Sequence, residues 1–93
     1  MRLDKFLQIT GLIKRRVLAN EACKRGLVKV NEVLAKPTRE VGVNDVIELQ
    51  LPKRDVAVKI LEEVTGSTLK KSRRNEVMEI LRDVQKAETD DDF

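Results

Sequence analysis

The sequence contains no histidine, and Cys23 is its single cysteine. Because histidine is the usual general base and metal ligand near neutral pH, its absence argues against most hydrolase and metal-dependent chemistries. One cysteine can form neither an internal disulfide nor a thiolate metal site by itself, which favours a reducing compartment over secretion. We therefore expect no cofactor, no metal and no enzymatic activity, and we interpret Cys23 as a small buried apolar residue.

Long apolar runs and most aromatic residues are also missing. No apolar run exceeds three residues, which excludes a membrane-spanning helix and a signal peptide. We expect a cytoplasmic protein with no membrane partner. Tryptophan and tyrosine are absent, and the two phenylalanines are Phe6, expected in the core, and Phe93. Proteins that bind single strands on a sheet stack bases on exposed rings, so this mode of recognition is largely excluded.

The 93 residues are 38% charged and 41% hydrophobic, which fits one domain with a small core and a densely charged surface. The formal net charge of +3 conceals an uneven distribution. Residues 1–31 carry eight bases and two acids, whereas residues 61–93 carry six bases and nine acids. The front of the chain is therefore strongly basic and its end is acidic.

Two short helices are predicted in the basic front. Over residues 2–10, Leu3, Phe6 and Leu7 follow the i, i+3, i+4 spacing of one apolar stripe. A second helix is predicted over residues 14–25, and Gly26 is expected to end it because glycine readily takes the left-handed conformation found after helices.

Beyond these helices the apolar period changes to two, which predicts strands. The expected strands are a hairpin over residues 28–35 and two further strands over residues 46–51 and 56–60. In the loop before the strand over residues 46–51, we expect Asn44 to take a left-handed backbone conformation. The predicted fold class is α+β, with the two-helix unit packed on a small, mainly antiparallel sheet.

The acidic end is predicted to differ from the rest. Residues 65–75 are polar and are expected to form a connector. Val77, Ile80, Leu81 and Val84 recur at i, i+3, i+4, i+7, which predicts a C-terminal helix over residues 76–88. Residues 89–93 are expected to be a disordered acidic tail. The domain proper is then expected to span residues 1–64.

The bases of the two helices favour a nucleic-acid-binding surface. Such a surface needs several Lys or Arg side chains on one face to displace counterions from closely spaced phosphates. Arg2 and Lys5 lie off the apolar stripe of the first helix, while Arg16, Asn20 and Lys24 succeed one another along one edge of the second. Lys29 and Lys36 could extend this surface. A solvated basic face is the plainer reading, but such faces normally mix both signs, and acids are nearly absent here.

Three strings of residues resemble the S4 RNA-binding domain. They are Arg2-Leu3-Asp4-Lys5-Phe6-Leu7, Lys14-Arg15-Arg16-Val17-Leu18-Ala19 and Gly26-Leu27-Val28-Lys29-Val30-Asn31. The resemblance covers residues 1–51 and implies two helices on a small sheet, presenting bases to RNA. It singles out Arg2, Lys5, Lys14, Arg15 and Arg16 as RNA contacts, with Arg16 first among them. Asn31-Glu32 and Thr10-Gly11 depart from residues common in that domain.

Within this family the chain is most similar to small stand-alone members that act in ribosome-associated quality control, and to their heat-shock relatives. That similarity implies a non-catalytic factor that binds the large ribosomal subunit, contacts ribosomal RNA and peptidyl-tRNA, and assists a protein partner in tailing stalled nascent chains. We also expect the protein to be a monomer. A ribosome assembly or heat-shock recycling role on the same RNA surface is an alternative. So is a protein-interaction or dimerisation module that uses the C-terminal apolar stripe. A third alternative is that the chain is the RNA-binding end of an RNA-modifying enzyme, but the 93 residues leave no length for a catalytic domain.

Overall fold

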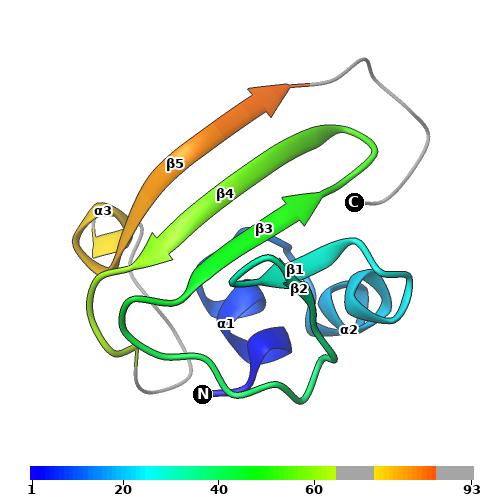
Figure 1. The fold of residues 1–93 in the computed structure, drawn as a ribbon, viewed down its shortest axis with the longest axis horizontal. Helices are drawn as coiled ribbons and strands as arrows, with labels where there is room; N and C mark the ends of the chain where they lie inside the picture. The colour runs from blue at the N-terminus through cyan, green and yellow to red at the C-terminus, as the bar shows by residue number, and fades with distance from the viewer. Residues whose placement is uncertain (65–72, 86–93) are drawn as a thin grey trace.

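The computed structural model describes residues 1–64 and 73–85. Two helices, α1 (Leu3–Ile9) and α2 (Arg16–Lys24), precede the strands β1 (Val28–Val30), β2 (Val33–Leu34), β3 (Val46–Gln50) and β4 (Arg54–Ile60). A single helical turn, α3 (Arg74–Val77), leads into the last strand, β5 (Met78–Gln85). The strands form one antiparallel sheet in the order β2-β1-β3-β4-β5, with α1 and α2 together on one side of it (Figure 1). The predicted α+β class is confirmed for these elements.

The core lies between the helices and the sheet. Alternate strand residues face the helices and are buried, as the series Val56, Val58 and Ile60 of β4 shows. From the helical side, Phe6 and Leu7 fill the same layer and are at most 1% exposed. The apolar stripe that predicted the first helix is therefore the stripe that packs on the sheet.

The end of α2 follows the prediction made for Gly26. Its backbone takes φ 74°, and its N–H donates to the Cys23 carbonyl at 3.1 Å. The next N–H, of Leu27, donates to the Ala22 carbonyl at 3.0 Å. This pair of bonds satisfies carbonyls that the helix end would otherwise leave open. Asn44 likewise takes the left-handed conformation expected of it, at φ 75°.

The C-terminal helix predicted over residues 76–88 is wrong. Of its described part, residues 76–85, only Glu76 and Val77 are helical, as the end of α3, and Met78–Gln85 is strand β5, which pairs along β4. Val58 lies opposite Ile80 but Ala57 lies opposite Arg82, so Leu81 is an extra residue that bulges from the ladder. The bulge shifts the alternation of side chains along β5 by one position. The apolar residues of this segment therefore do not recur every second residue in the sequence, and their spacing resembles that of a helix.

The remaining C-terminal predictions lie mostly outside the described residues. This holds for residues 65–72 of the expected connector and for the expected acidic tail over residues 89–93. On the outer face of the sheet, Arg82 Nη2 lies 3.5 Å from Glu48 Oε2, so an ion pair crosses β4 above the buried Ala57. Among the described residues, no helix is long and apolar enough to cross a membrane.

Candidate nucleic-acid interface

A buried carboxylate at the start of α1 connects the two helices. Asp4 is 2% exposed. Its Oδ2 atom lies 3.1 Å from Arg2 Nη2 and 3.5 Å from Arg16 Nε, and it accepts a hydrogen bond of 3.5 Å from Asn20 Nδ2. A buried charge is stable only when it is paired and hydrogen-bonded, and these three side chains provide that pairing. We call Asp4, Arg2, Arg16 and Asn20 the Asp4 cluster.

The two arginines of the Asp4 cluster face solvent while the carboxylate does not. Their side chains are 43% and 48% exposed. Each guanidinium has five N–H donors in a rigid fork, and Asp4 engages only part of them. Among residues 1–64 and 73–85 these side chains have no other ion-pair partner, so their remaining donors can bind an anion from solvent. Arg2 precedes α1 and Arg16 begins α2, so the carboxylate holds side chains from two elements in one place.

Backbone hydrogen bonds fix the start of α1 against the segment at residues 37–41. The N–H of Leu3 donates to the Arg39 carbonyl at 2.8 Å, and that of Asp4 donates to the Pro37 carbonyl at 3.1 Å. These carbonyls satisfy donors at the helix start, where the N-cap residue Arg2 makes no side-chain capping bond. The main-chain hydrogen bonds of Leu3 and Asp4 therefore fix the position of Asp4 against the segment at residues 37–41.

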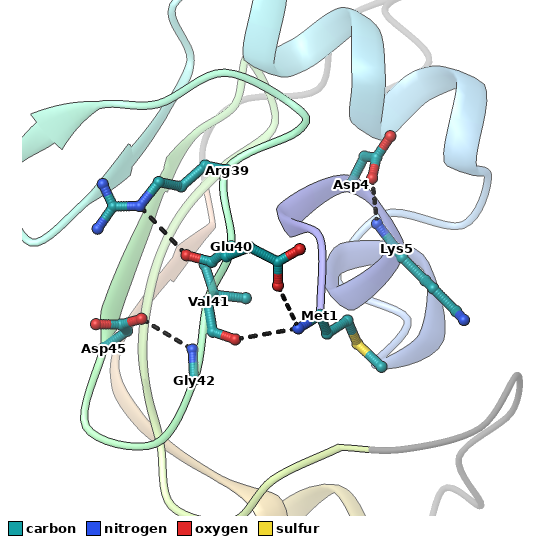
Figure 2. A network of polar contacts seen from close by, with 8 residues as sticks. All are labelled: Met1, Asp4, Lys5, Arg39, Glu40, Val41, Gly42 and Asp45. Atoms are coloured by element: carbon teal, nitrogen blue, oxygen red, sulfur yellow. Dashed lines mark hydrogen bonds and ion pairs between the residues drawn. The ribbon is translucent and has the colours of Figure 1, made fainter.

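Figure 2 shows the surroundings of this attachment. The N-terminal ammonium of Met1 donates to Glu40 Oε2 at 2.8 Å and lies 3.5 Å from the Val41 carbonyl oxygen. Further along the loop, Asp45 Oδ2 accepts from the Gly42 N–H at 2.9 Å. The Lys5 side chain extends away from Asp4, while its backbone N–H donates to Asp4 Oδ1 at 2.8 Å. Lys5 is therefore on α1 but is not a member of the Asp4 cluster.

Other predicted residues extend the exposed basic surface along α2. Lys14 and Arg15 are exposed in the segment that leads into the helix, directly before Arg16. Toward the other end of α2, Lys24 and Lys36 flank an open groove of about 640 Å³ between this helix and the segment after β2. Asn20 reaches the same groove, so it joins the groove to the Asp4 cluster.

Lys29 is the predicted site residue that the structure places elsewhere. Its neighbours Val28 and Val30 are buried on the helix side of the sheet, so Lys29 points to the outer face. There it lies opposite Glu48 of β3 and Leu34 of β2. The sheet therefore separates Lys29 from the bases of α1 and α2.

Cys23 lies beside the same groove but has the properties of a packing residue. It is 5% exposed, and its burial, with a further contribution from the charge of Asp4, raises the pKa of the thiol to about 11. The thiolate is the nucleophilic and metal-binding form, so this side chain is inert near neutral pH. In the part of the chain that the structure describes, no three His, Cys, Asp or Glu side chains are grouped to hold a metal ion.

Sequence reasoning missed the role of Asp4, which is not among the residues singled out above as RNA contacts. The signal was an acid among bases: Asp4 and Glu21 are the two acids in residues 1–31. An isolated carboxylate in a basic segment is a candidate for orienting neighbouring guanidinium groups. Its partners lie 12 and 16 residues further along the chain, at Arg16 and Asn20, and only the packing of α2 on α1 brings them to it.

Comparison with known proteins agrees with this geometry. The S4 domain family matches residues 1–47. Over 88 residues, the chain is 38% identical to a protein of Halalkalibacterium halodurans named RQC P-site tRNA stabilizing factor, covering 95% of this chain and 93% of the relative.

Two solved structures share the fold. One is the trimeric heat shock protein 15 of Vibrio cholerae, with a TM-score of 0.75 and 26% identity, covering 86% of this chain and 80% of that one. The other is the solution structure of a protein called HP1423, with a TM-score of 0.76 and 35% identity, covering 88% and 98%. The helical pair, the antiparallel sheet and the matched residues lead to one conclusion: the chain belongs to the S4 domain family.

Proposed function

We propose that the protein is a non-catalytic RNA-binding factor of the cytoplasm that binds the large ribosomal subunit. On this proposal it contacts ribosomal RNA and the tRNA held there after a ribosome has stalled. It assists a protein partner that extends the stalled nascent chain. The name of the full-length relative, RQC P-site tRNA stabilizing factor, supports this assignment because the two chains match over nearly their whole lengths.

The observation that carries the proposal is the Asp4 cluster. RNA phosphates are bound by cations that are exposed to solvent and held in a defined geometry. Arg2 and Arg16 meet both conditions, because their side chains are about half exposed and share one buried carboxylate. Lys14 and Arg15 on one side of the cluster, and Lys24 and Lys36 on the other, continue the same basic surface.

The direct test is co-sedimentation of the purified protein with large subunits that carry peptidyl-tRNA. We expect the wild-type protein to bind at moderate salt, and Arg16→Ala to lower the affinity by roughly 10-fold or more because it removes an oriented guanidinium. The matched control is Lys59→Ala. Lys59 alternates with the buried Val58 and Ile60 of β4, so this variant removes one positive charge from the outer face of the sheet.

Two results would contradict the proposal. One is a wild-type protein that does not bind the subunits. The other is an Arg16→Ala variant that binds as Lys59→Ala does, since the Asp4 cluster would then contribute nothing beyond net charge. Thermal unfolding of each variant, measured in parallel, separates a loss of contact from a loss of fold.

A further inference from the structure

A second group of cations adjoins the surface described above and shares Lys14 with it. The α1–α2 connection and the β3–β4 hairpin meet there and enclose an open groove of about 300 Å³. Lys14 contributes from the connection, and Lys53 and Arg54 contribute from the hairpin. The two hairpin residues carry no motif of the S4 resemblance, and the family match ends before them, at residue 47.

Apolar side chains hold both walls of this groove. Ile13 is 4% exposed, and its N–H donates to the Leu7 carbonyl at 3.1 Å, which ties the connection to α1. Leu51 is 2% exposed, and its N–H donates to the Arg54 carbonyl at 3.0 Å, which closes the hairpin. Both the α1–α2 connection and the β3–β4 hairpin are anchored in the core. The cations that they carry are therefore held at the rim of the same groove.

The strand alternation directs Arg54 toward the helices. Arg54 stands two residues before Val56 in the series that continues through Val58 and Ile60 and faces α1 and α2. Asp55 belongs to the opposite series, with Ala57 and Lys59, and so lies across the sheet from the groove. The nearest acid on the same face as Arg54 is Asp83, which lies opposite Val56 on β5, is exposed, and forms no ion pair with Arg54.

In the described part of the chain, the three groove cations, Lys14, Lys53 and Arg54, take part in no ion pair. Three cations at the rim of one groove create a local positive potential that attracts anions and raises their local concentration. The groove is open to solvent, so a phosphate can enter it.

We propose that this groove is a second phosphate-binding subsite, which holds the backbone of the same RNA that the Asp4 cluster contacts. Arg15 and Arg16 directly follow Lys14 in the chain, so cations run without interruption from the cluster to the groove. A free phosphate ion would need only the groove, whereas an RNA strand uses this continuity. The inference rests on the proposed function and deepens it by assigning Lys53 and Arg54 to the RNA-binding surface.

The test compares two double variants that remove the same charge. Lys53→Ala/Arg54→Ala empties the groove of its hairpin cations. Lys59→Ala/Arg73→Ala removes two cations near the other end of β4, where Arg73 pairs with Glu62 just beyond Ile60. We expect the first variant to weaken binding to large subunits carrying peptidyl-tRNA by roughly 5- to 20-fold, and the second by less than about twofold.

Backbone amide NMR spectra of the wild-type protein, recorded as a short double-stranded RNA is added, give an independent measurement. We expect the Leu12, Lys14 and Lys53 signals to shift along with those of the Asp4 cluster. The subsite is overturned if the RNA shifts only the cluster signals, or if the two double variants bind alike while the wild-type protein binds. If the wild-type protein does not bind the subunits, the proposed function fails, and the RNA titration alone decides whether the groove binds phosphates.

Discussion

At the scale of single residues, Asp4 shows how a negative charge can serve a surface that binds an anion. Arginine side chains have several rotatable bonds, and fixing them in one geometry costs conformational entropy when they bind a ligand. Asp4 lowers that cost in advance, because it already holds Arg2 and Arg16. Two guanidinium groups share this one carboxylate, so the cluster still presents a net positive charge to an approaching phosphate.

This interpretation gives a prediction whose sign differs from that of a simple charge model. Asp4→Asn raises the net charge by one, which by Coulomb attraction alone would strengthen RNA binding. We expect it instead to weaken binding to large subunits by roughly 5-fold, and to lower the free energy of unfolding by about 1–3 kcal/mol, because buried hydrogen bonds to a charge are lost. Filter binding and denaturant unfolding measure the two effects.

The control for this prediction is Glu79→Gln, which makes the same change in charge. Glu79 lies on β5 opposite Lys59 of β4, and it is exposed on the face of the sheet away from α1 and α2. If Asp4→Asn and Glu79→Gln change the affinity equally and in the same direction, Asp4 acts only through its charge and the orienting role is wrong.

At the scale of helices and strands, the elements that could be predicted are those whose formation depends on residues close together in the sequence. The stripe of Leu3, Phe6 and Leu7 and the stop at Gly26 depend on residues close in the chain, and both helices form where they were expected. The strand β5 depends on the edge of β4, which lies far from it in the sequence. Pairing with a distant edge overrides local spacing, and the bulge at Leu81 removed the alternation that could have indicated it.

The difference between local and long-range contacts also explains which residues of the site could be predicted from the sequence. Lys24 and Arg16 were found because helical periodicity places them on one edge of α2. Asp4 was missed because its contacts with Arg16 and Asn20 depend on how two helices pack. The position of Lys29 on the outer face was also hidden, since the alternation of a strand of three residues does not show which face the helices cover.

Mutations can test whether Met78–Gln85 is a strand and not a helix. The strand buries its first residue, Met78, at 4% exposed, and leaves Leu81 and Val84 about half exposed. We expect Met78→Ala to lower the free energy of unfolding by about 2–4 kcal/mol, and Leu81→Ala by less than about 1 kcal/mol. A helical stripe would instead bury Leu81 together with Val77, so a larger cost for Leu81→Ala than for Met78→Ala in denaturant unfolding would contradict the strand.

At the scale of the whole molecule, the net charge of +3 is a poor guide to the interface. The sheet divides the surface: ion pairs such as Arg82 to Glu48 balance charge on its outer face, whereas the helix side gathers cations around a single buried acid. The proposed surface, from the groove near Lys36 through the Asp4 cluster to the hairpin, contains eight cations: Arg2, Lys14, Arg15, Arg16, Lys24, Lys36, Lys53 and Arg54.

The salt dependence of binding measures how many of these cations act together. Each neutralised phosphate contributes about −0.7 to −0.9 to the slope of log affinity against log salt concentration, so contacts by four to eight cations predict a slope of roughly −3 to −7. We expect Arg16→Ala to make the slope shallower by about one, and Lys59→Ala/Arg73→Ala to leave it unchanged. Binding to large subunits across a series of potassium chloride concentrations gives these slopes. A wild-type slope shallower than about −2 would mean that few phosphates are contacted, and the extended basic surface would then not be the interface.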